Sequence, residues 1–284
     1  MSIKINHLTH IYGEGTAFEK KALDDINLEI EDGEFIGLIG HTGSGKSTLI
    51  QHLNALLVPT SGEVLLNGEN IYADKSKLKS IRQRVGLVFQ YPEHQLFEMT
   101  VYKDVAYGPG NLGLSQEEID KRVRSAFETV GLGEDVYDKS PFELSGGQKR
   151  RAAIAGVLAM EPEVLILDEP TAGLDPRGRD EILDAVKKMH DMRKITVILV
   201  SHSMEDVAKL VDRIVVLYKG RTAIVGTPRE VFRQREKLES IGLKAPQISY
   251  VFTDLKMRGY DLPTDVYTVA EATDVLYRFL KQVK

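Results

Sequence analysis

A glycine-rich loop between an apolar run and a helical segment constrains the fold of this chain more than any other feature. The apolar run is Phe35–Ile39, and the segment 48–57, which starts at Thr48, has the composition of a helix that stops before Pro59. Glycines let backbone N–H groups approach an anion closely, and a helix N-terminus adds partial positive charge. The succession of apolar strand, glycine-rich loop and helix predicts a nucleoside-triphosphate site rather than a turn that binds nothing. The loop has the spacing G-x-x-x-x-G-K-[ST], with Gly40, His41, Thr42, Gly43, Ser44, Gly45, Lys46 and Ser47.

Charged and hydroxyl residues complete the chemistry expected of this loop. Lys46 supplies a mobile cation for the β- and γ-phosphates, and the hydroxyl of Ser47 can bind Mg²⁺. Downstream, the apolar run 164–167 ends in Asp168 and Glu169. Open α/β sheets bind ligands at the carboxyl ends of their strands, so we expect Asp168 to hold Mg²⁺ and Glu169 to orient or deprotonate a water. A solvated strand end is the alternative for these two acids taken alone.

The apolar patterning favours α/β architecture. Ile26, Leu28 and Ile30 alternate with polar residues, as in a half-buried antiparallel strand. The runs 164–167 and 195–200 are apolar throughout, which suits a parallel sheet covered by helices on both faces. Strands that alternate with helices in this way predict a sheet with helices packed against it.

Helix signals follow between and after these strands. The middle of the chain, roughly residues 74–160, is mostly helical and includes a predicted capping box of Ser115 and Glu118. Asp175 and Pro176 have the pattern of an N-cap and a first helical position, for a helix that ends at about residue 192.

A second group of helix signals begins at Thr227 and Pro228. Thr268 and Glu271 form another predicted capping box. The helix after them has one apolar face, which either packs on the body of the protein or makes a subunit contact. The residues of this face are Val269, Ala272, Leu276, Phe279, Leu280 and Val283.

Composition excludes several classes of protein. Of the 284 residues, 42% are hydrophobic and 28% are charged, which is typical of a globular chain and not of a disordered one. The formal net charge of −5 gives no overall basic field for nucleic acid. The absence of cysteine excludes disulfides and thiolate sites. No apolar run approaches the about 20 residues of a membrane span, and no signal peptide is visible, so we expect any membrane role to depend on a partner.

The segment 144–148, upstream of Asp168, makes the prediction of a nucleotide-binding protein more specific. Other proteins with the same phosphate loop lack such a segment. Three further residues fit the order of motifs in one family. They are Gln90 at the end of an apolar strand, Asp175 at the end of the segment 172–175, and His202 after a second strand. With these motifs, residues 1–226 resemble the ATP-binding cassette family, the ATPase subunits of ABC transporters. The five residues of this signature are Leu144, Ser145, Gly146, Gly147 and Gln148.

The resemblance implies an α/β fold of the P-loop NTPase type, the ABC cassette. Such a cassette has a mixed sheet core, an antiparallel β subdomain and a helical subdomain, here at about residues 91–160. Residues 227–284 would be a C-terminal helical extension and a candidate dimerisation contact. The resemblance also implies that two cassettes pack head to tail, with each ATP and its Mg²⁺ between the phosphate loop of one chain and the signature of the other.

The resemblance assigns roles to single residues in this sandwich. Ser145 and the glycine amides of the signature would meet the γ-phosphate that the partner binds. His202 would hold the γ-phosphate and help position Glu169 and water. Asp175 would cross the interface, and Gln90 would bind or sense Mg²⁺ and link the site to the helical subdomain.

An aromatic residue near the N-terminus should stack on adenine in this family. Tyr12 fits by position, and Phe18 is the second candidate. Packing in the core is the alternative for Tyr12, since aromatic side chains are often simply buried.

Several segments are similar to a narrower group, the ATPases of energy-coupling factor transporters, and most to their second, A-prime, paralogue. These are residues 40–43, 89–98 and 173–178, together with the insertion 12–19 and the tail, although Tyr91 stands where we expect Phe. The resemblance implies import of vitamins or transition-metal ions. It also implies a heterodimer with a second ATPase, a transmembrane coupling protein and exchangeable substrate-binding membrane subunits, at the cytoplasmic face of the membrane.

Three other functions compete with this interpretation. The nearest is the ATPase of an ordinary ABC importer for another solute. A soluble cassette protein that acts on nucleic acid would carry a coiled-coil insertion or a second cassette, and a non-hydrolysing scaffold would not need Glu169 and His202. Lys149, Arg150 and Arg151 are more typical of a solvated helix start than of a nucleic-acid patch. The residues do not reveal the solute, nor do they decide between homodimer and heterodimer.

Overall fold

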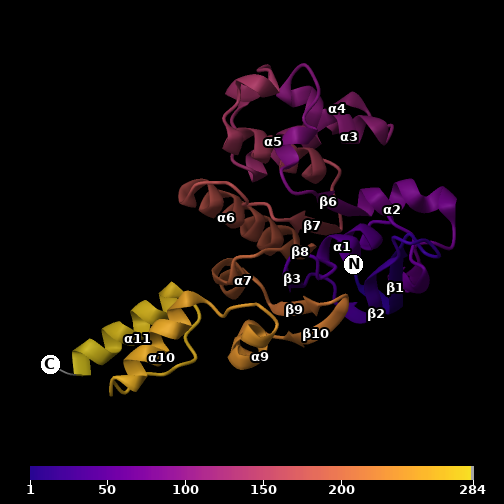
Figure 1. The fold of residues 1–284 in the computed structure, drawn as a ribbon. Helices are drawn as coiled ribbons and strands as arrows, with labels where there is room; N and C mark the ends of the chain where they lie inside the picture. The colour runs from indigo at the N-terminus through magenta and orange to yellow at the C-terminus, as the bar shows by residue number, and fades with distance from the viewer. Residues whose placement is uncertain (283–284) are drawn as a thin grey trace.

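The computed structural model describes residues 1–282 and has a six-stranded sheet at its centre (Figure 1). The strand order is β10-β9-β3-β8-β7-β6, and every neighbouring pair is parallel except β9 and β10. The apolar runs of the sequence form its central strands, as predicted. The strands are β3 (Phe35–Ile39), β6 (Val85–Val88), β7 (Val164–Asp168), β8 (Thr196–Val200), β9 (Arg213–Tyr218) and β10 (Arg221–Gly226).

A second, antiparallel sheet packs on one face of the first. Its order is β2-β1-β4-β5, with β1 (Ile3–Tyr12), β2 (Lys20–Ile30), β4 (Ser61–Leu66) and β5 (Glu69–Asn70). Ile26, Leu28 and Ile30 of β2 are buried and the residues between them are exposed, so the predicted alternation is confirmed. The two sheets and their covering helices form a mixed α/β architecture, as the sequence predicts.

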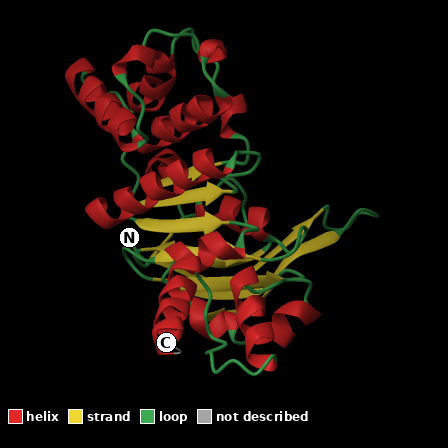
Figure 2. Cartoon of the chain, turned by 90° about the vertical axis from the view of Figure 1, so that its left-hand side faces the viewer, coloured by secondary structure: helices red, strands yellow, loops and turns green. Residues whose placement is uncertain are grey.

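Helices cover the central sheet and extend beyond both of its edges. In Figures 1 and 2, α3–α5 gather beyond the β6 edge, and α10 and α11 lie towards the β10 edge. The helices are α1 (Lys46–Leu53), α2 (Leu78–Arg84), α3 (Val101–Asn111), α4 (Gln116–Thr129), α5 (Gly146–Leu158), α6 (Pro176–Arg193), α7 (Met204–Leu210), α8 (Pro228–Phe232), α9 (Arg235–Ser240), α10 (Gln247–Met257) and α11 (Val269–Gln282). Short 3₁₀ helices are η1 (Lys75–Lys77), η2 (Pro92–Gln95), η3 (Glu134–Val136) and η4 (Pro141–Glu143).

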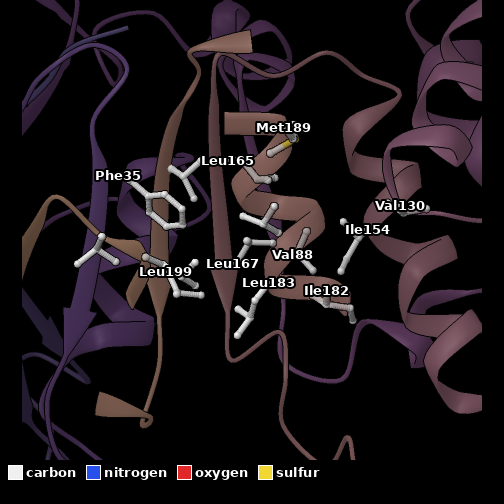
Figure 3. Close-up of a cluster of buried hydrophobic side chains, with 14 of the residues drawn as sticks. Phe35, Val88, Val130, Ile154, Leu165, Leu167, Ile182, Leu183, Met189 and Leu199 are labelled. Carbon is white, nitrogen blue, oxygen red and sulfur yellow. The ribbon is translucent and has the colours of Figure 1, made fainter. Parts of the chain in front are cut away.

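The central strands are apolar on both faces because each face meets a different layer. Leu165 and Leu167 of β7 belong to the cluster that includes α6, and Figure 3 shows Leu165 near Met189 and Leu167 near Leu183 of that helix. Val164 and Ile166, which point the other way along the same strand, belong to the cluster that contains α1 and the antiparallel sheet. Side chains alternate between the faces of a strand, so one five-residue strand joins both cores.

Two helix predictions need correction. The helix after the phosphate loop ends at Leu53 and not at residue 57, because Ala55 takes a left-handed backbone (φ 55°) and the N–H of Leu56 turns back to the carbonyl of Gln51. The N–H of Glu118 donates to Ser115 Oγ as predicted, but its carboxylate binds Arg122 at 2.7 Å instead of closing the capping box.

The tail packs in two parts. Phe232 of α8 and Leu238 of α9 are buried in the main core, whereas α10 and α11 share a small cluster of their own. The predicted box of Thr268 and Glu271 forms, with both hydrogen bonds at 3.2 Å.

The predicted apolar face of α11 is only partly buried. Ala272 is buried and Leu276 and Phe279 pack beside it, but Val269 and Leu280 are 71% and 62% exposed. Val269 and Leu280 lie on one edge of the apolar face of α11, and α10 covers the other edge. Val283 lies outside the described residues.

We predict that Leu167→Ala destabilises the chain by about 2–5 kcal/mol, because it leaves a cavity at a fully buried site between β7 and α6. Leu280→Ala, at an exposed position, is the matched control and should change stability by less than about 0.5 kcal/mol. Urea unfolding of the two variants measures the difference. Equal effects would contradict this account of the core.

Candidate active site

The parallel strands bring distant segments to one edge of the central sheet. Leu38 of β3 lies opposite Val200 of β8, and Val200 lies opposite Asp168 of β7. The phosphate loop, Asp168 and His202 therefore leave the sheet side by side. Ligands of open α/β sheets bind at this carboxyl edge.

The phosphate loop has the backbone that its glycines permit. Gly45, the N-cap of α1, has φ 108°, a conformation that L side chains rarely adopt. A Cβ on Gly40 would lie 2.5 Å from the carbonyl oxygen of Leu217, so the strand end and the loop approach too closely for any side chain. Lys46 is buried at the base, where its Nζ donates to the carbonyls of Gly40 at 2.7 Å and His41 at 3.3 Å.

A cleft of about 330 Å³ opens at this edge, within the usual range of small-molecule sites. It collects most of the predicted site residues, but Gly40, His41 and Ser44 of the phosphate loop do not line it. Its lining residues are Tyr12, Lys20, Ala22, Thr42, Gly43, Gly45, Lys46, Ser47, Thr48, Gln90, Asp168, Glu169 and His202.

Lys20 and Ala22 were not predicted to belong to the site. The signal was the strand pairing, since Lys20 lies directly opposite Tyr12 in the β1–β2 ladder, at the end of the insertion 12–19. Residues that face each other across an antiparallel pair share a surface. A hairpin assignment for this insertion would have placed Lys20 beside the predicted adenine position.

Oxygen ligands of the kind that Mg²⁺ prefers meet in the cleft. Ser47 Oγ lies 3.5 Å from Asp168 Oδ2, and Gln90 lines the same space. Among residues 1–282, no group of three or more His, Cys, Asp or Glu side chains is arranged for a metal ion. The hydroxyl, the carboxylate and the amide together suit a hard cation that takes its remaining ligands from phosphate and water.

Glu169 occupies an unusual position next to this cluster. Its backbone is left-handed (φ 51°). Its buried Oε1 lies 3.1 Å from His202 Nε2, but the two atoms do not have the geometry of a hydrogen bond, so this oxygen has no hydrogen-bond partner. Burial, with a smaller effect of the Asp168 charge, raises the pKa of Glu169 to about 7 against the attraction of Lys46. A buried carboxylate with a free oxygen is well placed to accept a hydrogen bond or a proton from a bound water.

The other charged groups of the cleft are also shifted by burial. Burial raises the pKa of Asp168, and Lys46 and Ser47 oppose the shift. Burial lowers the pKa of Lys46, and the two carboxylates oppose it. Burial and the charge of Lys46 lower the pKa of His202 and so favour its neutral form.

Tyr12 and Phe18 have different surroundings. Tyr12 lines the cleft, its hydroxyl lies 3.3 Å from Thr48 Oγ1, and its ring meets His10 edge to face. It is 41% exposed, so it is not a core residue. Phe18 is 88% exposed and does not line the cleft.

The signature segment lies outside the cleft. Ser145 caps α5 with a complete capping box to Gln148, and Leu144 is buried beneath it. A Cβ on Gly146 or Gly147 would meet nothing within 4 Å, so the glycine backbone faces open space. Asp175 also lies outside the cleft and caps α6 through a 2.7 Å bond from the Gly178 N–H, as predicted.

The raised pKa of Glu169 predicts a pH-dependent effect of Glu169→Gln on the nucleotide-free chain. The folded pKa of about 7 lies above the ordinary value of 4.5. The stabilising contribution of the protonated acid is therefore complete below about pH 4.5 and is lost as the pH rises through about 7. The variant should therefore be more stable than the wild type at pH 8, and the two proteins should be closer in stability at pH 4. Urea unfolding with EDTA at several pH values measures this, and a difference independent of pH would contradict it.

The comparisons with known proteins agree with this geometry. A family model described as ABC transporter matches residues 23–172. The energy-coupling factor transporter ATP-binding protein EcfA2 of Caldanaerobacter subterraneus is 57% identical over 100% of this chain and 99% of the relative. The protein of the same name from Clostridium tetani is 59% identical over 98% of this chain and 97% of its own.

Solved structures show the same fold. The chain cbiO1 of Clostridium perfringens, described as part of the ABC transporter complex cbiONQ, matches with a TM-score of 0.76 and 41% identity, over 88% of this chain and 98% of its own. The dimeric cassette MJ0796, bound to ADP and Pi, matches with a TM-score of 0.72 and 31% identity, over 80% and 98%.

No helix among the described residues has the length and apolar content to cross a membrane. The chain nevertheless matches subunits of membrane transporters over its full length. The cleft and these relatives lead to one conclusion: the chain is an ATP-binding ATPase of the ABC transporter family and belongs to the energy-coupling factor transporter ATP-binding proteins.

Proposed function

We propose that this chain is the motor subunit of an energy-coupling factor importer for vitamins or transition-metal ions, driven by closure of an ATPase dimer on ATP. The observation that carries the proposal is the shared edge at which Lys46, Asp168, Glu169 and His202 surround one cleft. Lys46 supplies a cation, and Asp168 supplies a carboxylate that can bind Mg²⁺. Glu169 is the candidate base, and His202 is a neutral imidazole. Phosphoryl transfer to water uses groups of these kinds.

Each group of the cleft has a distinct task in this proposal. Lys46 turns from the loop carbonyls towards the β- and γ-phosphates, which the loop amides and the α1 N-terminus also bind. Glu169 orients water through its unpaired Oε1, and His202 holds the γ-phosphate beside it. Tyr12 stacks on the adenine, at the open end of the cleft near Lys20.

Ser47, Asp168 and Gln90 would hold Mg²⁺, and their oxygen donors fit that ion. The bound ion would neutralise charge on the phosphate oxygens during hydrolysis. Because burial disfavours the charged form of Asp168, a cation there would also relieve the cost of ionising it.

A second ATPase chain would complete the site. Gly146 and Gly147 have open space beside their Cα atoms and do not line the chain's own cleft. With the N-terminus of α5, they are available to bind the γ-phosphate held by a partner. Asp175 would approach the partner across this interface. A heterodimer with a second, different ATPase is the arrangement that kinship with energy-coupling factor transporters implies.

The membrane partners follow from the same kinship. The chain would sit at the cytoplasmic face of the membrane, bound to a transmembrane coupling protein that serves separate substrate-binding subunits. The relative described as part of cbiONQ supports such a multi-subunit assembly. No nucleic-acid partner is proposed, since the net charge is −5.

We predict that Glu169→Gln binds ATP, keeps the dimer closed and lowers turnover by at least about a hundredfold, because the amide cannot accept a proton from water. Phosphate release by the assembled transporter measures turnover, and size-exclusion chromatography with ATP measures dimer closure. Glu117→Gln, at an exposed position of α4, is the control and should keep wild-type turnover. Normal hydrolysis by Glu169→Gln would remove Glu169 from the proposed role.

Affinity purification of the tagged chain from detergent-solubilised membranes tests the type of transporter. We expect a second ATPase chain, a coupling membrane protein and at least one separate substrate-binding membrane protein. Recovery of only a pair of permease subunits with an external binding protein would favour an ordinary ABC importer instead. The Lys46→Ala variant, measured in the same preparation, separates assembly from nucleotide binding, since it should assemble but bind ATP poorly.

A further inference from the structure

Arg150 departs most from what the sequence predicts. As the middle residue of three consecutive cations near the start of α5, it was expected to be solvated, but that expectation is wrong. Its side chain is 2% exposed, and it is among the largest fully buried side chains of the described chain. A buried guanidinium is costly unless charge and hydrogen bonds compensate it, so its partners identify what it holds.

The partners of Arg150 come from two other segments. Its Nε and Nη2 donate to the two carboxylate oxygens of Glu93, at 3.0 and 2.7 Å. Its Nη1 donates to the backbone carbonyls of Pro170 at 3.2 Å and Ala172 at 2.5 Å. The fork on Glu93 and the two carbonyls use all three nitrogens of one planar group, which lysine cannot do.

These segments are the ones that carry the motifs of the site. Glu93 lies in η2, three residues after Gln90, and Arg150 lies one turn into the helix that Ser145 caps. Pro170 and Ala172 belong to the loop that leaves the sheet at Glu169 and reaches Asp175. One side chain therefore joins the segment after Gln90, the signature helix and the loop of the candidate base.

Other anchors of this loop are the hydrogen bond from the Glu169 N–H to the Val200 carbonyl, at 3.0 Å, and the packing of Leu174 against the main core. Its backbone makes short turns, from the Ala172 N–H to the Glu169 carbonyl and from the Leu174 N–H to the Thr171 carbonyl. The left-handed backbone of Glu169 needs support from its surroundings, because that conformation is strained for a residue with a side chain. The carbonyls on either side of Thr171 are both held by Arg150.

We propose that Arg150 is a positioning residue, which fixes the loop of Glu169 against the signature helix and so links a chain's own hydrolytic site to the signature that serves its partner. This inference rests on the proposed sandwich of two ATPases. When the signature moves onto a nucleotide, the rigid α5 helix carries Arg150 with it. The loop from Glu169 to Asp175 then follows, and so does Glu93 of η2.

The first test measures the loop directly, without turnover. Hydrogen exchange of the full-length, nucleotide-free chain reports on the amides of residues 169–175. Arg150→Met and Glu93→Gln should both accelerate exchange there by about tenfold or more, while the central strands stay protected. Arg151→Met is the matched control, because Arg151 is the next residue of α5 and also pairs with a carboxylate, Glu181, at 3.3 Å. Unchanged exchange in residues 169–175 in both Arg150→Met and Glu93→Gln would overturn the proposal.

The second test measures the consequence in the assembled transporter. Misplacing the base should lower kcat by about tenfold or more and change KM for ATP by less than about threefold. Arg150→Lys should recover little, since lysine retains the charge but not the fork, and Arg151→Met should match the wild type. Loss of thermal stability with an unchanged kcat per folded molecule would make Arg150 merely structural and overturn the proposal.

The two tests separate the inference from the proposed function. If the wild-type complex hydrolysed no ATP, the proposed function would fail, and exchange in residues 169–175 would still decide whether Arg150 orders the loop. Glu93→Gln guards against misfolding of the arginine variants, because it keeps the buried guanidinium and nearly the same volume. The double variant of Arg150→Met and Glu93→Gln should have the same kcat as Arg150→Met alone, since Glu93 acts on the loop only through Arg150.

Discussion

The common edge of the parallel strands is the constraint on which the rest of this structure depends. The register that sets Asp168 opposite Val200, and Val200 opposite Leu38, makes three distant parts of the chain leave the sheet together. That register is held by side chains buried on both faces of the strands. A slip of the pairing by one residue would turn every side chain of the strand to the opposite face of the sheet. It would also move Asp168 and Glu169 away from the phosphate loop.

The cleft at this edge holds charges that the nucleotide-free chain only partly compensates. Burial raises the pKa of Asp168 and Glu169 and lowers that of Lys46, so each group is held in surroundings that disfavour its charge. Phosphates and a divalent cation would compensate these charges, and ligand binding should therefore stabilise the fold. The unpaired Oε1 of Glu169 and its left-handed backbone belong to the same pattern, in which strain and unmet hydrogen bonding collect where chemistry takes place.

In the proposed dimer, the parts of the cassette serve two different nucleotides. The phosphate loop, the acids and His202 lie at the chain's own cleft, whereas the signature lies outside that cleft, at the N-terminus of α5. A buried arginine bridges the two groups through Glu93 and the carbonyls of Pro170 and Ala172. The tail also has a packed and an open part. Helices α8 and α9 pack on the body of the protein, whereas α11 leaves Val269 and Leu280 exposed.

The sequence by itself determined the features that depend on neighbouring residues: the strand, loop and helix around Lys46, the N-caps at Ser115 and Asp175, and the alternation in β2. Their physics is local, because hydrogen bonds and side-chain periodicity act within a few positions. Tertiary structure alone decided the burial of Arg150 and which edge of α11 is covered. Each of these depends on a segment distant in the chain, and a one-dimensional pattern does not say which surface that segment will meet.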